Sequence, residues 1–424
     1  MDDLKIAIIG AGSGYTSELI EEISKQEEIL NVRQVVLYDI DENRLGIMGD
    51  FCTRYLKAKG SNIKLKRTGN LTEAVEGAQF IDTQIRVGGN KQRVMDEKIP
   101  LKYGLLGQET TGAGGMFKAF RTIPVMLEIA REIEKVNPDA WIVNYTNPTG
   151  LITEALIKKS KVKIAGLCSG GLFPKWWAKK ALGVDEKDVD YDYVGLNHMN
   201  FAYNLKIGGR SVSDQEFDKI AEASNHGEVN FGLMKKLRLI PSPYIKYFFH
   251  RSKVIEELKS KKTTRGEDVL EIEKEVFKAF SDPQQVTIPE ILYKRGGGGY
   301  SEVAISIIKA IYTDTPKKIV VNVPNNGAIK WLPDDAVIET PCLVNSAGIK
   351  PLAVPELPET VWGLISAVKN YEQLAVEAAL TGSLDLAELA LLAHPLIGDW
   401  ELIKPLMKEM MDANSKFLPQ FKHN

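Results

Sequence analysis

The sequence is poor in cysteine, and its charges nearly cancel. Three scattered cysteines, Cys52, Cys168 and Cys342, cannot form a disulfide framework, which favours a reducing compartment such as the cytoplasm. The 54 Lys and Arg residues face 56 Asp and Glu residues, for a formal net charge of −2. Because no basic domain or long Lys/Arg stripe stands out, we expect no nucleic-acid partner.

Long apolar runs are also missing. No window approaches the roughly 20 apolar residues that a membrane-spanning helix needs. Asp2 and Asp3 precede the first apolar run, whereas a secretory signal begins with basic residues and has a longer apolar stretch. We therefore expect no membrane partner and a cytoplasmic location. With 44% hydrophobic and 26% charged residues, the 424-residue chain has the composition of a globular protein of two or three domains.

The first half alternates short apolar runs with helical segments. The run Lys5–Gly10 is continuously apolar, as expected of a parallel strand that is buried on both faces. A glycine loop and a helix over Thr16–Ile29 follow it. Further strands are predicted at Val35–Tyr38, Lys64–Lys66, Phe80–Val87 and Ala140–Tyr145, with helices at Arg44–Ala58, Thr72–Glu76 and Ile123–Val136. This alternation predicts an α/β fold with a Rossmann-like, doubly wound parallel sheet.

The pattern changes after about residue 165. Apolar residues recur at helical spacing over Val269–Phe280, and Thr360–Leu380 predicts a long helix. Strands are expected between them, at Lys318–Val323 and Ala336–Val344. We therefore predict two domains: a Rossmann domain over residues 1–165 and a second, α+β domain over residues 166–424.

A glycine-rich loop joins the first strand to the first helix. At such a loop, backbone N–H groups and the helix dipole can face a pyrophosphate. Tyr15 stands where the strict G-x-G-x-x-G pattern has its last glycine. Asp39, at the tip of the second strand, can accept hydrogen bonds from ribose hydroxyls and would repel a 2′-phosphate. The pattern predicts an NAD site formed by Gly10, Gly12, Ser13, Gly14 and Asp39.

The segments that follow two of the predicted strands indicate which kind of Rossmann protein this is. Arg86-Val87-Gly88-Gly89 leads into a basic segment with Lys91 and Arg93, and Asn144-Tyr145-Thr146-Asn147-Pro148 ends another strand. This arrangement resembles the lactate/malate dehydrogenase superfamily, which has a basic loop and an Asn-Pro at these places. A 2-hydroxyacid-type NAD dehydrogenase is therefore a rival interpretation, although the superfamily's loop with the catalytic histidine is missing.

A second set of motifs runs through the rest of the chain. In order, it comprises Gly107-Gln108-Glu109-Thr110-Thr111-Gly112, Gly166-Leu167-Cys168, Gly195-Leu196-Asn197-His198, Ser242-Pro243-Tyr244 and Lys294-Arg295-Gly296-Gly297. With the N-terminal loop, this ordered set resembles glycoside hydrolase family 4, the NAD- and metal-dependent glycosidases, from Lys5 to Pro395. Within the family the sequence looks most like the 6-phospho-β-glucosidases.

The resemblance implies an oxidation–elimination mechanism in place of the two carboxylates of ordinary glycosidases. NAD⁺ takes a hydride from C3 of the sugar, and the resulting ketone acidifies the proton on C2. A base removes that proton, the C1–O bond breaks, water adds, and NADH returns the hydride. The implied activity is hydrolysis of 6-phospho-β-glucosides, without net consumption of NAD.

The resemblance also implies a divalent metal. Cys168 and His198 match the family's ligands of a cation that holds the negative charge developing on the sugar oxygens. A Cys/His pair alone suits zinc or iron as well, so manganese is carried over from the family. Taken singly, Cys168 is equally interpreted as a buried small hydrophobe and His198 as a core histidine.

Tyr244 matches the position at which the family has its C2 base. A tyrosine with a pKa of about 10 is a poor base unless a metal or another positive charge lowers that pKa. Tyr244, Tyr247 and Phe248 are also typical of an aromatic helix face, and Tyr247 is the alternative assignment for the base.

Charged residues in two loops match substrate-binding positions of the family. Arg93 matches the arginine that holds the sugar's 6-phosphate, which suits a guanidinium fork, and Lys91 could assist it. Arg295 precedes the glycine run Gly296–Gly299 and matches an arginine near the sugar hydroxyls and the metal. Glu109 is expected either to bind a sugar hydroxyl or to support the residues that contact the substrate. Each is also open to interpretation as a solvated loop charge.

The two asparagines of the Asn-Tyr-Thr-Asn-Pro segment complete the implied site. Asn147 should hydrogen-bond sugar hydroxyls, and Asn144 should face the nicotinamide side. The implied partners are a phosphorylated sugar and further copies of the chain, as a homodimer or homotetramer.

Ser169 departs from the family pattern. It follows the metal cysteine, at a substrate-site position where the phospho-β branch has Asn, the phospho-α branch an acidic Asp and unphosphorylated branches commonly His. A serine hydroxyl is too weak an acid to protonate a leaving group efficiently, which argues against the phospho-α mechanism. The alternatives left open are a 6-phospho-α-glycosidase or an unphosphorylated glycosidase of the family, a 2-hydroxyacid dehydrogenase and an NAD-binding sensor.

Overall fold

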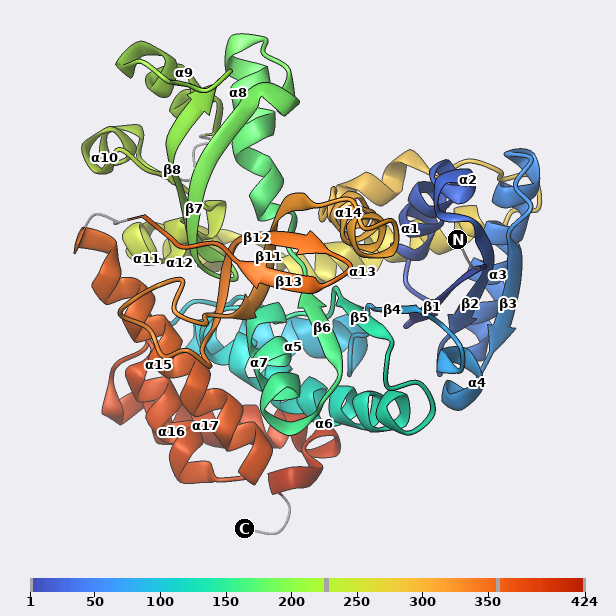
Figure 1. Ribbon diagram of the computed structural model, residues 1–424. Helices are drawn as coiled ribbons and strands as arrows, with labels where there is room; N and C mark the ends of the chain where they lie inside the picture. The colour runs from blue at the N-terminus through green and yellow to red at the C-terminus, as the bar shows by residue number, and fades with distance from the viewer. Residues whose placement is uncertain (1–2, 225–228, 356–358, 422–424) are drawn as a thin grey trace.

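The computed structural model describes residues 3–224, 229–355 and 359–421. Its main sheet has nine strands in the order β13-β12-β11-β6-β5-β4-β1-β2-β3 (Figure 1). Strands β1 to β6 run parallel, whereas β11, β12 and β13 are antiparallel to their neighbours. The strands are β1 (Leu4–Ile9), β2 (Val32–Tyr38), β3 (Lys64–Thr68), β4 (Phe80–Thr83), β5 (Trp141–Asn144), β6 (Lys163–Gly166), β11 (Lys317–Pro324), β12 (Val337–Asn345) and β13 (Gly348–Pro351).

Apolar cores cover both faces of this sheet. In β1, Ile6 and Ile8 belong to one buried cluster while Ala7 and Ile9 belong to the other, because successive side chains of a strand point to opposite faces. This confirms the predicted doubly wound α/β fold. The helices of this half are α1 (Thr16–Lys25), α2 (Glu27–Leu30), α3 (Glu42–Ala58), α4 (Leu71–Val75), α5 (Gly89–Lys102), α6 (Gly112–Val136) and α7 (Thr149–Lys159).

The rest of the chain adds a small antiparallel sheet, ordered β10-β8-β7 with β9 paired to β8, and further helices. The remaining strands are β7 (Val189–Leu196), β8 (Met199–Ile207), β9 (Arg210–Ser211) and β10 (Ile240–Pro241). The remaining helices are α8 (Phe173–Leu182), α9 (Asp214–Ser224), α10 (Phe231–Leu237), α11 (Lys246–Phe249), α12 (Arg251–Ser260), α13 (Arg265–Phe280), α14 (Tyr300–Tyr312), α15 (Glu359–Thr381), α16 (Leu384–Ala393) and α17 (Trp400–Asn414).

The two halves of the chain share the main sheet. Strand β11 pairs with β6 through Asn322 and Gly166, so residues after position 166 cover an edge that β6 would otherwise expose. The strands predicted at Lys318–Val323 and Ala336–Val344 form, but they extend the first sheet. The division into residues 1–165 and 166–424 therefore remains a prediction about folding units, and the main sheet lies across it.

Three predicted elements differ in extent from the observed ones. The helix over Thr16–Ile29 is interrupted at Gln26, which leaves helical geometry at φ −110° and separates α1 from α2. The strand over Phe80–Val87 ends at Thr83, and the following residues turn into a large cavity. Helix α6 begins eleven residues before Ile123, at Gly112, because its glycines allow close packing against the preceding loop.

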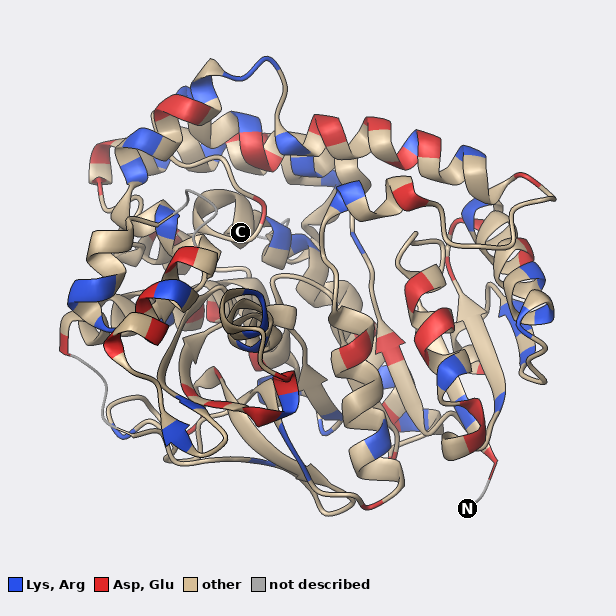
Figure 2. Ribbon diagram, turned by 90° about the horizontal axis from the view of Figure 1, so that it is seen from above, with Lys and Arg blue, Asp and Glu red and all other residues tan. Residues whose placement is uncertain are grey.

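Charges are interspersed over the outer helices, where Figure 2 shows Lys and Arg alternating with Asp and Glu. Among the described residues, no helix is both long enough and apolar enough to cross a membrane. The surface therefore agrees with the near-zero net charge of the sequence.

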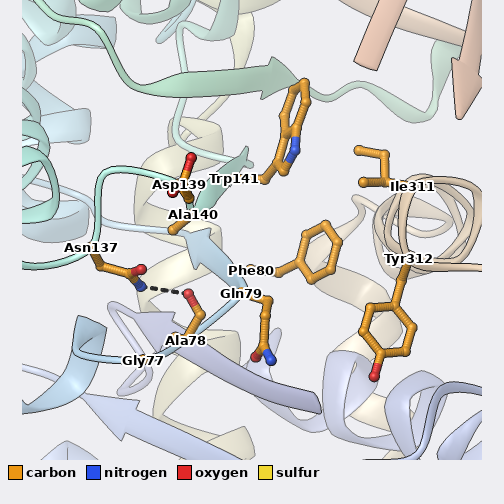
Figure 3. A pocket seen from close by; sticks show the side chains of 10 residues that line it. All are labelled: Gly77, Ala78, Gln79, Phe80, Asn137, Asp139, Ala140, Trp141, Ile311 and Tyr312. Atoms are coloured by element: carbon orange, nitrogen blue, oxygen red, sulfur yellow. Dashed lines mark hydrogen bonds between the residues drawn. The ribbon is translucent and has the colours of Figure 1, made fainter. Parts of the chain in front are cut away.

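A small cavity of about 330 Å³ lies at the amino ends of β4 and β5 (Figure 3). The Asn137 side-chain amide there donates to the carbonyl oxygens of Val75 and Ala78. This hydrogen bonding joins the end of α6 to the segment before β4, so Asn137 stabilises the fold at this edge. In open α/β sheets, ligands bind at the opposite edge, at the carboxyl ends of the strands.

Candidate active site

A cavity of about 1470 Å³ opens at the carboxyl ends of β1, β2, β4 and β5. Its size and its place at the carboxyl ends of the strands are those expected of a site for a ligand of dinucleotide size. The residues predicted from the sequence that line it are Gly10, Gly12, Ser13, Asp39, Arg93, Glu109, Asn147, His198, Tyr244 and Arg295. The structure thus brings most of the predicted site into one space.

The glycine loop and Asp39 form one end of this cavity. The Asp39 carboxylate accepts the Gly12 N–H at 2.7 Å and the Asp41 N–H at 2.9 Å, which holds it at the tip of β2. Gly10 has φ +88°, and a Cβ there would lie 3.0 Å from the Gln84 carbonyl group, so glycine is required. The loop leads directly into α1, whose amino end favours an anion.

Arg295 reaches the same loop from a distant part of the chain. It ends the 3₁₀ helix η4 (Glu290–Arg295), and its guanidinium lies over the Tyr15 ring, 4.5 Å from the ring centroid. Its Nη1 atom is buried without a hydrogen-bond partner, 3.1 Å from where a Cβ on Gly14 would lie. The Tyr15 hydroxyl also donates to the Gly296 carbonyl oxygen. Arg295 thus presents an unpaired donor at the cofactor loop.

A charged cluster surrounds Glu109 deeper in the cavity. Its carboxylate contacts Arg86, Arg93 at 3.0 Å and Lys118 at 2.7 Å. Burial alone would raise the pKa of Glu109, but these three cations outweigh burial and hold that pKa well below its usual range. Arg93 also donates to Glu97 at 2.8 Å. When Lys118 carries its proton, three cations face two carboxylates and the cluster has a net positive charge.

Lys118 is the most perturbed cation of this cluster. Its side chain is 3% exposed, and burial, followed by the neighbouring Arg86, lowers its pKa to about 7. Glu109 partly opposes this shift. Near neutral pH, Lys118 can therefore exist with or without its proton beside the substrate cavity.

Cys168 and His198 come from two distant parts of the chain, and of the two, His198 lines the cavity. Cys168 follows β6 and caps the 3₁₀ helix η1 (Ser169–Leu172), where its Sγ accepts the Gly170 N–H at 3.4 Å. His198 is the second residue of the two-residue turn between β7 and β8, with φ +65°. Burial, followed by the Glu339 carboxylate, raises the pKa of the Cys168 thiol. Burial, followed by Lys118, lowers the pKa of His198 to about 3, so its imidazole is neutral.

This donor set fits a divalent transition metal. A neutral imidazole and a thiol that can lose its proton to a cation are both suitable ligands. The buried Oδ1 of Asn147, which also lines the cavity, has no hydrogen-bond partner. Within residues 3–224, 229–355 and 359–421, no group of three or more His, Cys, Asp and Glu side chains could hold a metal. Cys168 and His198 would therefore supply two donors, and the other positions on a metal would be left to substrate or water.

Tyr244 lies directly against the histidine. It belongs to the 3₁₀ helix η3 (Pro243–Ile245), and its ring stacks on the His198 ring with centroids 3.7 Å apart and planes 4° from parallel. Burial, followed by Tyr247 and Cys168, raises the pKa of Tyr244 well above its usual value. Tyr247 packs edge-on against Tyr244 at 5.9 Å and also lines the cavity. The stacking on His198 distinguishes Tyr244 from the alternative base.

Four predicted site residues, Gly14, Asn144, Cys168 and Ser169, are not among those that line the cavity. Asn144 is fully buried, and its amide is engaged by the Thr83 hydroxyl at 2.8 Å and the Thr146 N–H at 3.0 Å, so it shapes the turn after β5. Its expected place on the nicotinamide side stays a prediction. Ser169 is 4% exposed within η1, and Gly14 packs under Leu292 and Arg295.

Glu339 of β12 was not predicted from the sequence. Fully buried, its carboxylate accepts hydrogen bonds from Tyr193 at 2.8 Å, Asn197 at 2.9 Å, Asn200 at 3.0 Å and Asn322 at 3.0 Å. It thereby fixes the β7–β8 turn that carries His198. A charged residue inside an apolar strand, Val337-Ile338-Glu339, was the signal that could have revealed it.

Two family models match the chain. A family 4 glycosyl hydrolase model matches residues 5–175, and the C-terminal domain model of the same family matches residues 193–397. The chain therefore belongs to family 4 of the glycoside hydrolases, which confirms the resemblance in its motifs.

Full-length relatives carry 6-phospho-β-glucosidase names. The chain is 41% identical to a probable 6-phospho-beta-glucosidase of Bacillus subtilis (strain 168), covering 99% of this chain and 98% of that protein. It is 36% identical to the 6-phospho-beta-glucosidase of Escherichia coli (strain K12), covering 99% and 97%. The structure of the Thermotoga maritima 6-phospho-beta glucosidase with NAD and glucose-6-phosphate superposes with a TM-score of 0.92 at 37% identity, covering 98% and 99%.

A more distant solved structure shares the fold. Malate dehydrogenase of Cryptosporidium parvum superposes with a TM-score of 0.58 at 15% identity, covering 89% of this chain and 99% of that one. This confirms the dehydrogenase-like sheet predicted from the sequence. At such low identity the likeness concerns the fold alone.

Proposed function

We propose that this chain hydrolyses 6-phospho-β-glucosides with the help of NAD and a divalent metal, manganese in the first instance. The observation that carries the proposal is the single cavity that joins three features. These are a dinucleotide-binding loop, a net positive cluster around Arg93, and His198 stacked on Tyr244. Burial raises the pKa of Tyr244, and the Cys168 thiol is close enough to Tyr244 to contribute to that rise. The names of the full-length relatives and the NAD and manganese in a Thermotoga maritima structure support the proposal.

The charged cluster is suited to the sugar's 6-phosphate. Arg93 lies between Glu97 and Glu109, which orient its guanidinium, and Lys91 lines the cavity nearby. A phosphate dianion would add negative charge where the cations exceed the carboxylates. Arg93 therefore holds the substrate by its phosphate end and fixes the sugar ring relative to Tyr244.

Tyr244 is proposed to remove the C2 proton. Bound NAD supplies a hydride acceptor, and a bound divalent cation supplies Lewis acidity and positive charge. In the absence of such a cation, burial raises the pKa of Tyr244 and keeps its hydroxyl protonated. Formation of the phenolate therefore needs a positive charge near the ring. Cys168 and His198 would hold that cation next to Tyr244. Asn147, with its free Oδ1, would accept a hydrogen bond from a sugar hydroxyl.

Arg295 is proposed to act at the boundary between cofactor and sugar. Its unpaired Nη1 faces the glycine loop, and the residue lines the shared cavity. A guanidinium there would favour the cofactor diphosphate, and as a residue that lines the shared cavity, Arg295 is also proposed to donate to a sugar hydroxyl. Glu109 is proposed to orient Arg93 and Lys118, with which it forms ion pairs.

The alternatives receive less support. The named maltose-6'-phosphate glucosidase of Fusobacterium mortiferum is 28% identical, compared with 36–41% for the phospho-β relatives. Ser169 is buried and offers no acid of the phospho-α kind. A 2-hydroxyacid dehydrogenase is favoured only by fold likeness. Assembly as a dimer or tetramer stays an expectation from the family resemblance. Sedimentation velocity would measure the oligomeric state.

A leave-out assay tests the proposed function. Nitrophenol release from the β-glucoside 6-phosphate should require both NAD⁺ and Mn²⁺, with no net accumulation of NADH. The α-anomer and the unphosphorylated β-glucoside serve as matched substrates. Release from the α-anomer alone would overturn the anomeric assignment, and equal release from the unphosphorylated glucoside would overturn the role of Arg93. NADH formation from a hydroxyacid, without nitrophenol release, would favour the dehydrogenase.

A further inference from the structure

The loop before α6 contacts the ring of His198. The Thr110 Oγ1 lies 3.0 Å from His198 Nδ1 and 2.9 Å from the side-chain oxygen Oε1 of Gln108. The Thr110 backbone N–H also donates to this Oε1, at 2.5 Å. Three polar groups, from residues 108, 110 and 198, thus form one short chain of hydrogen bonds.

The direction of each hydrogen bond in this chain can be assigned by elimination. A backbone N–H can only donate, so the Gln108 atom that it meets must be the acceptor oxygen. The Thr110 hydroxyl has a single hydrogen, which it donates to the same oxygen. Its Oγ1 can then only accept from the ring, and His198 must carry its hydrogen on Nδ1. In a neutral imidazole, this leaves the lone pair on Nε2.

The backbone packing keeps this loop in place. Helix α6 begins with glycines, and a Cβ on Gly114 would lie 2.3 Å from the Gln108 carbonyl oxygen. A Cβ on Gly115 would lie 2.5 Å from the Thr110 carbonyl carbon. Only glycine at these positions lets the loop lie this close to the helix, so Gln108 and Thr110 have little freedom to move away from His198. The Tyr244 ring covers one face of the imidazole.

We propose that Thr110, oriented by Gln108, is a positioning residue that holds His198 as the Nδ1-protonated tautomer and leaves Nε2 free to bind the metal. This inference rests on the proposed function, because it concerns the same metal site. Metal-binding histidines in general depend on such a partner at the other ring nitrogen, and loss of that partner typically lowers metal affinity by about 10- to 100-fold.

The tautomer can be measured without any metal. Protein labelled with ¹⁵N-histidine, prepared metal-free and with NAD, would be examined by long-range ¹H–¹⁵N correlation, with His198→Gln to assign the resonances. The wild-type ring should be neutral with its hydrogen on Nδ1. A hydrogen on Nε2 in the wild type would overturn the proposal. This measurement gives a result whether or not the protein is a glycosidase.

A variant pair tests the hydroxyl. Thr110→Val keeps the shape and removes the hydroxyl, while Thr110→Ser keeps the hydroxyl and removes the methyl group. Mn²⁺ affinity, from the electron paramagnetic resonance of free Mn²⁺, should fall about 10- to 100-fold in Thr110→Val and return in Thr110→Ser. NAD affinity should be unchanged in both. Equal Mn²⁺ affinity in Thr110→Val and wild type would overturn the proposal, whereas a wild type that binds no Mn²⁺ would contradict the proposed function.

Discussion

The two ends of the large cavity are built in different ways. The core of the cofactor end comes from one continuous stretch, in which the Gly12 amide meets Asp39 only 27 residues later, and Arg295 is added to it from a distant segment. The metal end combines Cys168 after β6, His198 between β7 and β8, and Tyr244 in η3. A strand–loop–helix unit determines its own geometry locally, whereas the metal end exists only when distant segments pack together.

The two ends also differ in how they tolerate change. At the cofactor end, backbone amides and a helix terminus do most of the binding, so a single side chain contributes modestly. The metal end depends on a small number of side chains, each with its own function. Glu339 holds several of the surrounding groups in place. Substitutions should therefore have larger effects at the metal end, and the following experiments are arranged by expected size.

Replacement of the proposed base should have the largest effect. Tyr244→Phe should lower kcat by about 10²- to 10⁴-fold, because a general base contributes on this scale. NAD affinity, measured by fluorescence titration, should stay unchanged. Tyr247→Phe is the matched control, and it should retain most activity. Equal losses in both variants would mean that the stacking on His198 does not identify the base.

Replacement of the thiol ligand tests the metal site itself. Cys168→Ser should weaken Mn²⁺ binding more than about 100-fold, since loss of a direct ligand exceeds the effect of its supporting partners. Cys52→Ala, in a buried core position of α3, is the control and should bind Mn²⁺ normally. Isothermal titration with NAD present measures both. Tight Mn²⁺ binding by Cys168→Ser would remove this residue from the site.

Replacement of Arg93 tests the phosphate end. Arg93→Gln should raise KM for the 6-phosphorylated β-glucoside by about 10- to 100-fold, because hydrogen bonds between charged groups contribute about 1.5–3 kcal/mol. Arg33→Gln, at an exposed position in β2, is the matched control. An unchanged KM in Arg93→Gln would place the phosphate elsewhere.

Acid should destabilise the metal end and the core alike. Burial lowers the pKa of His198 and of His394 to about 3, from 6.5 in the unfolded chain, so the unfolded state takes up protons first. Stability is then complete above about pH 6.5 and falls as the pH drops towards 3. When the pH is lowered from 7 to 5, each histidine should lower the free energy of unfolding by roughly 2 kcal/mol.

The variant His394→Gln checks this pH dependence. His394 is 1% exposed and accepts the Gly112 N–H at 3.2 Å, so it lies in the core beside the start of α6. Urea unfolding of the metal-free protein at pH 7 and pH 5 should show a smaller loss of stability in His394→Gln than in wild type. An identical loss would show that this histidine titrates normally in the folded state.

The smallest effect is expected at the cofactor end. Asp39→Asn keeps an acceptor for the Gly12 N–H but removes the charge that meets the ribose hydroxyls. NAD affinity should fall roughly tenfold, on the scale of about 1.4 kcal/mol, and discrimination against NADP should weaken. Should Asp39→Asn reduce NAD binding more than Cys168→Ser reduces Mn²⁺ binding, the comparison between the two ends would fail.

Sequence patterns predicted the local parts of the molecule well. Apolar runs of the right length gave the parallel strands, and the long helices α13 and α15 followed from their periodicity. The predicted strand over Phe80–Val87 was too long, because the burial pattern alone does not show where the chain turns into the cavity. The first residues of α6 are rich in glycine, which is unfavourable in helices, so the sequence did not predict that the helix begins there. Their close packing against the preceding loop explains why glycine is needed.

The site residues divide in the same way. The glycine loop, Asp39 and the motifs around Cys168, His198 and Tyr244 were visible as residues at defined positions in the chain. Thr110, Lys118 and Glu339 were not predicted as site residues, because their importance comes from contacts with residues that lie 88, 9 and 142 positions away, respectively. Asn144 and Ser169 were predicted from the family resemblance, and because both side chains are buried, their roles in the site stay predictions.

The sequence by itself determined the doubly wound sheet, the cofactor loop and the family of this protein, because these depend on short-range periodicity and on the order of motifs. Only the tertiary structure decided which side chains face one another: Arg295 against the glycine loop, Tyr244 against His198, and Thr110 against the imidazole nitrogen. The physical reason is that hydrogen-bond direction, burial and ion pairing act over a few ångströms, and the sequence does not specify which distant residues come that close.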